Sequence, residues 1–334
     1  MGYYMLVLVY RAGSIGDQVL VTPLLRYLKN RGDTVYFAGN NVGLTLLKGN
    51  PNVDKLISCH MPKFVEVDEY NKKLEELQDK YKPDLFINCN GVVEHGASIM
   101  QDSVDFYKST ELRQFKYANI NFIENHFTEA GIDTSKLTSK DFIPEMYYDK
   151  KEKKHIKGIL DSKKFNLVYV MGGSGRYKRY PHVDNLIFTI LDKYPDIEVY
   201  LIGGKNEVML EEGLDHERIH KMCGNLSIRE SMLLSSKASC IISPDTGMLH
   251  AAGCNNTPKI SILTNTSVNN VTKHYKNVHN ITATAKCSPC CRIIYPDIVE
   301  STCNCDEDTA APECIYNIKI ESIIEALDKV MEGD

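Results

Sequence analysis

The sequence predicts an α/β protein of two Rossmann-like, doubly wound domains that face each other across a cleft. Its 334 residues suit two domains of about 150 residues better than one core. Short continuous apolar runs, typical of strands buried on both faces of a parallel sheet, alternate with segments of helical apolar spacing. The alternation starts at the N-terminus and starts again near residue 166. Each half therefore predicts a sheet of its own.

The first half opens with an apolar strand, a glycine-containing turn and a helix. Apolar residues recur at helical spacing over residues 19–28. Pro23 lies early in this helix, where the first N–H groups have no internal acceptor, so it is tolerated. The expected strands are 5–10, 34–38, 55–58 and 84–88, and the further helices are 44–48 and 68–80.

The second half restarts the same pattern after a dense charge run at residues 149–155. We interpret this run as a solvated helix start near a domain junction and place the boundary there, between domains 1–155 and 156–334. The strands expected in this half are 166–170, 198–202, 238–243 and 259–263, and the helices are 183–193, 227–235, 248–253 and 318–330.

Composition excludes several classes of protein. The net charge of −5 disfavours nucleic-acid binding, which usually requires a basic surplus. No apolar run approaches the roughly 20 residues that span a bilayer. The N-terminus leads straight into a strand without the basic start of a signal peptide. We therefore expect a cytoplasmic protein with at most peripheral membrane contact.

Ligands of open parallel sheets bind at the carboxyl ends of the strands, so the loops after the strands carry the functional information. The first loop holds Gly16 and Asp17 at the start of a helix. The helix dipole would keep the Asp17 carboxylate ionised, and such a carboxylate can take a proton from a hydroxyl. An ordinary helix cap explains Asp17 equally well. The loop lacks the third glycine and the downstream acid of a dinucleotide fingerprint, which disfavours hydride transfer.

The second loop, residues 172–181, combines glycines with Ser174 and Lys178. Backbone N–H groups, a hydroxyl and an ammonium suit a diphosphate, although the spacing is not that of a P-loop. A turn with solvent-facing basic residues is the alternative. The third loop, residues 244–250, runs from a buried strand into a helix through Asp245, Thr246 and Gly247. Free backbone N–H groups at that helix start also suit a phosphate. Taken singly, Asp245 is equally explained as a helix cap and His250 as a satisfied core histidine.

The three loops together resemble glycosyltransferase family nine, the lipopolysaccharide heptosyltransferases. The shared motifs are Gly-Asp, Thr-Pro and Leu-Arg in the first helix region, Lys before an aromatic-Pro pair, and Asp-Thr-Gly with a histidine three residues beyond the glycine. The family's tryptophan before that proline is replaced by Tyr180, and residues 92–144 match no motif. These motifs stand here as Gly16-Asp17, Thr22-Pro23, Leu25-Arg26, Lys178, Tyr180-Pro181, Asp245-Thr246-Gly247 and His250.

The resemblance implies a GT-B fold and an inverting transfer from a nucleotide diphosphate-sugar, an ADP-sugar, that needs no catalytic metal. It implies that the N-terminal domain lies on the acceptor side and the C-terminal domain binds the donor. Asp17 would be the catalytic base. The residues that the resemblance assigns to the donor site are Gly16, Ser174, Lys178, Glu207 near the ribose, Met222 near the adenine, Asp245, Thr246, Gly247 and His250.

Cysteines gather in one segment of the C-terminal domain. Six of the eleven lie within residues 287–314, and clustered cysteines in a chain without an export signal favour a metal over disulfides. Four thiolates suit a closed, structural zinc or iron site. Some relatives in the family carry the same series of cysteines, and a few related protein heptosyltransferases contain iron. Thiols in a loop without a metal are the alternative. The expected ligands are Cys287, Cys290, Cys303 (with Cys305 as the alternative) and Cys314.

Two functions remain in competition. The first is transfer of a sugar, heptose by resemblance, to a hydroxyl on a lipopolysaccharide-like glycan, a lipid-linked acceptor or a protein. The second is non-catalytic binding of a nucleotide-sugar, with a degenerate acceptor site. A metal-dependent nucleic-acid binder rests on the cysteines alone and is disfavoured by the net charge.

Overall fold

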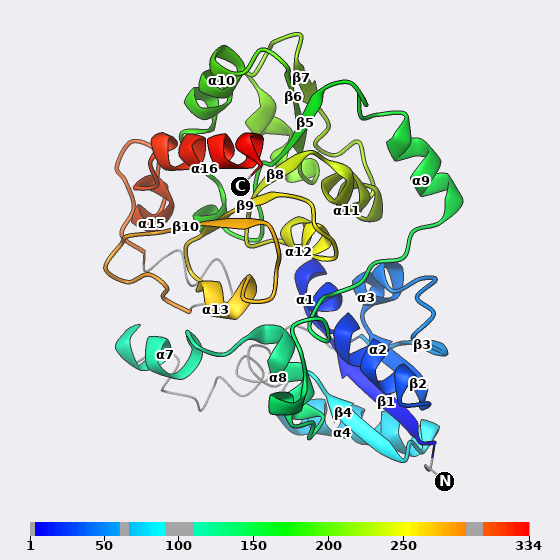
Figure 1. Cartoon of the computed structure of the whole chain (residues 1–334). Coiled ribbons are helices and arrows are strands. Elements are labelled where there is room, and N and C mark those ends of the chain that lie inside the picture. Colours follow the sequence, from blue (N-terminus) through cyan, green and yellow to red (C-terminus); the bar gives the residue numbers. More distant parts are fainter. Residues whose placement is uncertain (1–3, 61–66, 91–109, 292–302, 334) are drawn as a thin grey trace. The chain divides into compact units, whose positions relative to one another are not determined.

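The computed structural model of the chain describes residues 4–60, 67–90, 110–291 and 303–333. The chain divides into two compact units: unit 1 is Met1–Lys116 with Ile120–Tyr147, and unit 2 is Tyr117–Asn119 with Tyr148–Asp334. Each unit holds one sheet (Figure 1), and all strand pairs are parallel. The predicted α/β class with two parallel sheets is confirmed.

The sheet of unit 1 has four strands in the order β3-β2-β1-β4. The first strand lies at the centre of this order and pairs on both sides, with Val7 opposite Val35 and opposite Leu85. Its interior residues are fully buried, which explains the unbroken apolar run in the sequence. The strands are β1 (Leu6–Arg11), β2 (Thr34–Gly39), β3 (Lys55–Ser58) and β4 (Leu85–Asn88).

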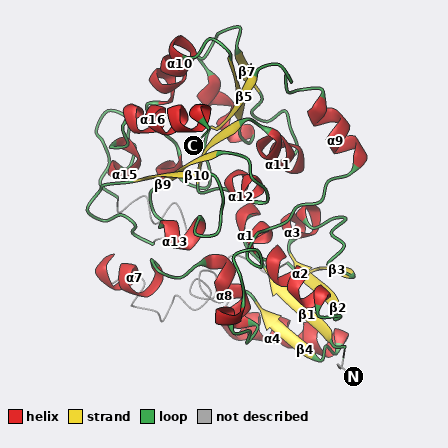
Figure 2. Ribbon diagram, viewed as in Figure 1, coloured by secondary structure: helices red, strands yellow, loops and turns green. Residues whose placement is uncertain are grey.

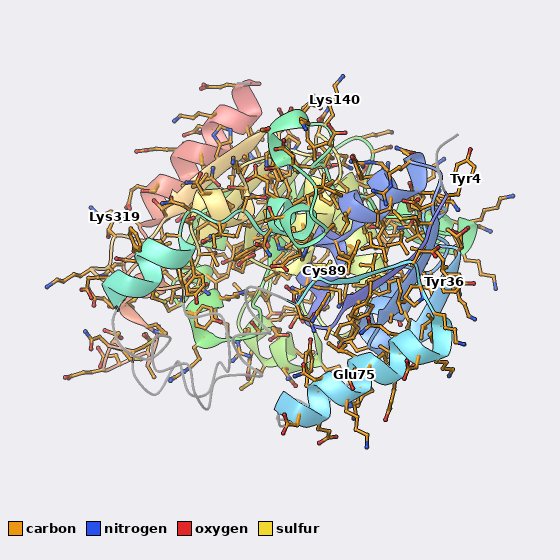
Figure 3. All side chains as sticks on the ribbon, turned by 90° about the horizontal axis from the view of Figure 1, so that it is seen from below. Tyr4, Tyr36, Glu75, Cys89, Lys140 and Lys319 are labelled. Carbon is orange, nitrogen blue, oxygen red and sulfur yellow. The ribbon has the colours of Figure 1, made fainter. Side chains whose placement is uncertain are left out.

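Helices of unit 1 cover the sheet with their apolar sides. Leu74 and Leu77 of α4 (Val67–Tyr81) pack with Leu8 and Tyr10 of β1 in one core cluster. Glu75 on the same helix points outward (Figure 3), as expected of an amphipathic helix. The other helical elements are α1 (Ile15–Leu20), α2 (Thr22–Asn30), α3 (Asn41–Leu46), α7 (Thr110–Tyr117), α8 (Phe122–Glu129) and the 3₁₀ turn η1 (Thr134–Lys136).

The prediction of one continuous helix over residues 19–28 is wrong. The chain forms two helices, α1 and α2, that meet at Val21. Pro23 stands at the second position of α2, where its missing N–H costs no hydrogen bond. The proline therefore marks a helix start rather than an interior position that the helix tolerates.

The sheet of unit 2 has six strands in the order β10-β9-β8-β5-β6-β7. Four of them coincide with predicted strands. The outer strands β7 and β10 were not predicted, since one has three residues and the other is only half-buried, and neither forms a long apolar run. The strands are β5 (Phe165–Val170), β6 (Ile197–Ile202), β7 (Ile219–Lys221), β8 (Cys240–Pro244), β9 (Lys259–Leu263) and β10 (Val278–Thr282).

Alternate residues of these strands face two separate cores, as a doubly wound sheet requires. Leu167 and Leu201 pack against α10 (Val183–Lys193) and α16 (Ile320–Glu332) on one face. Val168 and Ile202 pack against α11 (Ile228–Lys237) and neighbouring helices on the other. Figure 2 shows these helices around the sheet. The remaining helical elements are α9 (Lys150–Lys157), η2 (Arg176–Lys178), η3 (Lys205–Glu211), α12 (Gly247–Gly253), α13 (Val268–Val271) and α15 (Glu313–Tyr316).

The charge run at residues 149–155 forms α9. Asp149 caps the start of this helix in a capping box with Glu152. Glu152 also pairs with the buried Arg229 of α11, Nε to Oε1 at 2.6 Å. Residues 91–109, within the region that matched no family motif, lie outside the described residues, as do residues 292–302 of the cysteine-rich segment. Among the helices that the structure describes, none is both long and apolar enough to cross a bilayer.

A buried histidine lies in the core of unit 1. His126 of α8 is 4% exposed, and neither ring nitrogen has a hydrogen-bond partner among the described residues. Burial, and secondarily the positive charge of Arg11, hold the pKa of His126 well below its usual range. The ring is therefore neutral in the folded chain, and protonating it disfavours folding.

This burial predicts a loss of stability in acid. In the unfolded chain a histidine binds a proton below about pH 6.5, so the wild type should lose ~1.4 kcal/mol per pH unit through His126 below that pH. His126→Leu should abolish this contribution, whereas His60→Gln, at an exposed position, should retain it. Urea unfolding at about pH 7 and about pH 5 gives the comparison. Equal acid destabilisation of wild type and His126→Leu would contradict the assignment.

Candidate functional site

Two loops of unit 2 lie side by side where β5 and β8 end. A Cβ added to Gly173, just after β5, would lie 2.9 Å from Cδ of Lys178 and 3.1 Å from Cγ2 of Thr246. Neighbouring parallel strands bring their carboxyl ends to one edge, and β5 and β8 are such neighbours. The structure therefore brings the predicted residues Lys178, Thr246 and, next in the chain, Gly247 together, and Gly173 makes room for the close approach.

The loop after β6 joins the same edge. A Cβ on Gly172 would lie 3.2 Å from Glu207, and one on Gly203 would lie 2.6 Å from it. Glu207 is 9% exposed; its Oε2 accepts from the N–H of Gly204 at 2.9 Å, and its Oε1 lies 3.3 Å from Nη2 of Arg179. The structure thus places Glu207 beside the glycine loop. Arg179 was not predicted, because its pairing with Glu207 joins residues far apart in sequence.

The carboxylate of Asp245 lies at the centre of a polar network. The Lys178 ammonium donates to the Asp245 backbone carbonyl at 2.5 Å and lies 3.8 Å from Oδ2. Nε2 of His250 lies 3.3 Å from Oδ1, and the Thr266 hydroxyl donates to Oδ2 at 3.2 Å. Burial by itself would raise the pKa of Asp245, but Lys178, His250 and Thr266 outweigh it and lower the pKa. Asp245 is therefore ionised and accepts hydrogen bonds only.

Three further predicted donor-site residues belong to unit 2. Thr246 precedes the first residue of α12, and its hydroxyl lies 3.1 Å from that of Ser243. Ser174 is exposed in the loop after β5. Met222 follows β7, where its N–H donates to Leu201 and its side chain packs at the margin of a core cluster.

Gly16 and Asp17 belong to unit 1, in the first turn of α1. One carboxylate oxygen of Asp17 accepts from the Ser14 N–H at 2.6 Å, and the other lies 2.8 Å from Nη2 of Arg11. Arg11 is 4% exposed, and its Nη1 donates to Asn90 at 3.2 Å. Asp17 is thus both part of a helix cap and the partner of a buried arginine. Arg11 was also missed, although a charged residue closing a buried strand is a signal that could have been used.

The four predicted thiol ligands belong to unit 2, and electrostatic interactions link three of them to Cys314. Burial, followed by the negative charges of Cys290, Cys287 and Cys303, raises the pKa of Cys314 to about 12. Cys305 is exposed, and its Sγ lies 3.6 Å from the Cys303 carbonyl. Within the described ranges, no group of three or more His, Cys, Asp or Glu side chains is arranged to hold a metal ion.

The close packing at Gly203 predicts a local steric effect. Gly203→Ala places a methyl group 2.6 Å from Glu207 Cβ and 2.9 Å from Cys223 Sγ, so it should destabilise the fold by about 1–3 kcal/mol. Gly158→Ala is the control, since its nearest atom is the His155 carbonyl at 3.4 Å; it should change stability by less than about 1 kcal/mol. Chemical denaturation measures both, and equal effects would show that the glycine is not required by its neighbours.

Comparison with known proteins adds the family and the fold. The family model described as glycosyltransferase family 9 (heptosyltransferase) matches residues 119–296, more than half of the 334-residue chain. A comparison with curated protein sequences gives no match.

Solved structures share the fold over nearly the whole chain. ADP-heptose lipopolysaccharide heptosyltransferase II of E. coli is 16% identical, with a TM-score of 0.64 and 98% of each chain covered. A family 9 glycosyltransferase of Veillonella parvula is 13% identical, with a TM-score of 0.68, covering 99% of this chain and 98% of that one. The iron-containing dodecameric glycosyltransferase TibC of enterotoxigenic E. coli is 13% identical, with a TM-score of 0.60, covering 98% and 77%. Fold and family model agree: the chain belongs to glycosyltransferase family 9 and has a GT-B-type fold.

Proposed function

We propose that the chain is an inverting glycosyltransferase that moves heptose from an ADP-sugar to a hydroxyl on a lipopolysaccharide-like glycan or a protein. Family membership supports a transferase. The names of structures with the same fold support the donor: one acts with ADP-heptose, and another, from E. coli, is a heptosyltransferase with ADP-2-deoxy-2-fluoro heptose. We propose the same class of donor, an ADP-sugar, for this chain.

The Lys178–Asp245 pair is the observation that carries the proposal. The Lys178 side chain lies where the loops after β5 and β8 meet, since its Cδ and the Thr246 Cγ2 would both contact a Cβ on Gly173, and its ammonium donates to the Asp245 carbonyl. Asp245 holds it there through its carbonyl and its carboxylate. A diphosphate at this edge would receive the ammonium and the Thr246 hydroxyl as donors, and charge-assisted hydrogen bonds to phosphate are strong. Glu207, an acceptor beside the same glycine loop, suits ribose hydroxyls.

The proposed reaction needs one base and one stabilised leaving group. The acceptor oxygen attacks the anomeric carbon, forming the new glycosidic bond as the bond from that carbon to the diphosphate oxygen breaks. The electron pair leaves with ADP, whose developing charge Lys178 stabilises. The hydroxyl proton passes to the Asp17 carboxylate. Direct displacement inverts the anomeric centre.

Arg11 and Ser14 orient Asp17 without using up its acceptor capacity. One oxygen of the carboxylate lies beside the Arg11 guanidinium, and the other accepts from the Ser14 N–H. A carboxylate offers about four lone-pair sites, so positions remain for a substrate hydroxyl. The cap and the base are therefore compatible roles for Asp17.

Two variants separate catalysis from donor binding. Asp17→Asn should lower turnover by about 10²–10⁴-fold and leave ADP affinity nearly unchanged, since a base acts on the acceptor.

Lys178→Ala should weaken ADP binding, and less so at high salt, because salt screens the attraction between the ammonium and the phosphates. Calorimetric titration with ADP and a transfer assay measure both. Full activity of Asp17→Asn would show that Asp17 is a helix cap and not the catalytic base. A wild type that binds ADP-sugar but never transfers it would establish the non-catalytic alternative.

We further propose a structural zinc or iron held by Cys287, Cys290, Cys303 and Cys314. The support is the clustering of six cysteines within residues 287–314, the electrostatic link of three of these thiols to Cys314 and the iron named for TibC; in the described residues the four side chains are not arranged as a metal site, so binding would have to draw them together. Four thiolates repel one another, and a divalent cation relieves that repulsion; thiolate sulfur suits both metals. Cys303 is preferred to Cys305, because its charge acts on Cys314. The metal would stabilise the loop and take no part in transfer.

The metal proposal predicts about one zinc or iron per chain, since four thiolates form one site. Cys287→Ser and Cys314→Ser should lose it, while Cys305→Ser and Cys291→Ser should keep it. Chelation should lower the melting temperature, because a metal bound only by the folded state stabilises that state. Elemental analysis of protein purified without a metal-affinity tag is decisive. If the protein contains no metal and all of these cysteines react with a thiol reagent, the metal proposal is wrong and the cysteines are thiols in a loop.

A further inference from the structure

Tyr275 joins the Asp245 network from outside every recognised motif. It lies between α13 and β10, and it is 6% exposed. Its hydroxyl oxygen lies 2.7 Å from Nδ1 of His250, and the other ring nitrogen of His250 lies 3.3 Å from Asp245 Oδ1. The imidazole therefore bridges a buried phenol and a half-buried carboxylate.

The two neighbours select one neutral tautomer of His250. Asp245 is ionised and can only accept, so Nε2 must carry the hydrogen that faces it. Nδ1 is then an acceptor, and the Tyr275 hydroxyl donates to it. The opposite tautomer would aim the Nε2 lone pair at a carboxylate, which is repulsive. Burial, followed by the negative charges of Cys254 and Asp245, raises the pKa of Tyr275 far above its usual range, so the phenol keeps the proton it donates.

Packing holds the Tyr275 ring in place for this contact. A Cβ added to Gly253 would lie within 2.6–2.8 Å of three atoms of the ring, so the glycine lets the ring rest against α12. His250 and Gly253 are three residues apart on that helix, and such residues share a face. The same helix therefore presents both the imidazole and the surface against which Tyr275 packs. The Tyr275 N–H donates to the Thr272 carbonyl at 2.9 Å, which fixes the backbone.

We propose that Tyr275 is a positioning residue for the donor: its hydroxyl donates to Nδ1 and holds the orientation of His250, whose Nε2–H keeps Oδ1 of Asp245 paired. Without that N–H, the carboxylate would depend more strongly on Lys178, the ammonium that the diphosphate needs. Tyr275 thus makes Lys178 available to phosphate without touching the ligand. This inference rests on the proposed function, which places the diphosphate at Lys178.

Tyr275→Phe tests the inference, because it removes only the hydroxyl. Histidine ¹⁵N NMR of the wild type should show His250 as the Nε2–H tautomer with a hydrogen-bonded Nδ1; His250→Gln identifies the signals. In Tyr275→Phe the Nδ1 signal should shift toward that of an acceptor without a donor. Affinity for ADP should fall about tenfold, on the order of one hydrogen bond's contribution, because a less firmly held His250 leaves Asp245 to bind Lys178 more strongly in competition with phosphate.

Tyr194→Phe is the matched control, since it also removes one hydroxyl hydrogen bond, to Asp328 at 2.6 Å. It should change neither the His250 signals nor ADP affinity. Gly253→Ala provides a second route, because it displaces the ring while keeping its hydroxyl, and it should reproduce the Nδ1 shift.

Unchanged His250 signals in Tyr275→Phe, or the opposite tautomer in the wild type, would overturn the inference. So would a shifted signal with unchanged ADP affinity, since the positioning would then have no consequence. A wild type that binds no ADP contradicts the proposed function instead, and the ligand-free NMR comparison still decides whether Tyr275 donates to His250.

Discussion

The pairing of the largely enclosed Asp245 carboxylate, whose side chain is 12% exposed, is the interaction on which the candidate donor site depends. An ionised carboxylate removed from water is strongly unfavourable unless cations and hydrogen-bond donors surround it. Lys178, His250 and Thr266 fill that role. They come from the segments after β5, β8 and β9, so a single charge holds together three loops at the carboxyl edge of the sheet.

Glycines allow that arrangement, because the loops approach more closely than a side chain would permit. At Gly172 and Gly173 an added Cβ would meet Glu207, Lys178 and Thr246 at about van der Waals contact or closer. The glycine-rich sequence therefore has a steric purpose here in addition to exposing N–H groups to a ligand. Charge and sterics act on the same few residues, which explains why the loop and the Asp-Thr-Gly motif occur together.

Much of this organisation could be predicted from the sequence, for identifiable reasons. Strands β1, β5 and β8, whose following loops hold predicted residues, are almost entirely buried, and a strand buried on both faces is a continuous apolar run. The loops after them hold glycine beside polar residues, which is locally visible. The marginal strands β7 and β10 are short or half-buried and give no such signal. The break between α1 and α2 was missed because the apolar spacing continues across it, while Pro23 alone marks the new start.

Residues whose role depends on a distant partner could not be predicted in the same way. Arg11 pairs with Asp17 within six residues, yet its link to Asn90 spans most of unit 1. The contacts of Arg179 with Glu207 and of Tyr275 with His250 join residues that only the folded unit 2 brings together. Such pairs follow from the order of strands in the sheet, and that order cannot be deduced from local pattern.

A crystal structure of the chain with an intact ADP-sugar tests the central claim most directly. The account predicts the diphosphate within hydrogen-bond distance of the Lys178 ammonium and the Thr246 hydroxyl, with Asp245 still bonded to His250 through Oδ1. Lys178 would then have exchanged its contact with the Asp245 carbonyl for a phosphate oxygen. A diphosphate bound elsewhere, with the Lys178–Asp245 pair intact, would contradict the account.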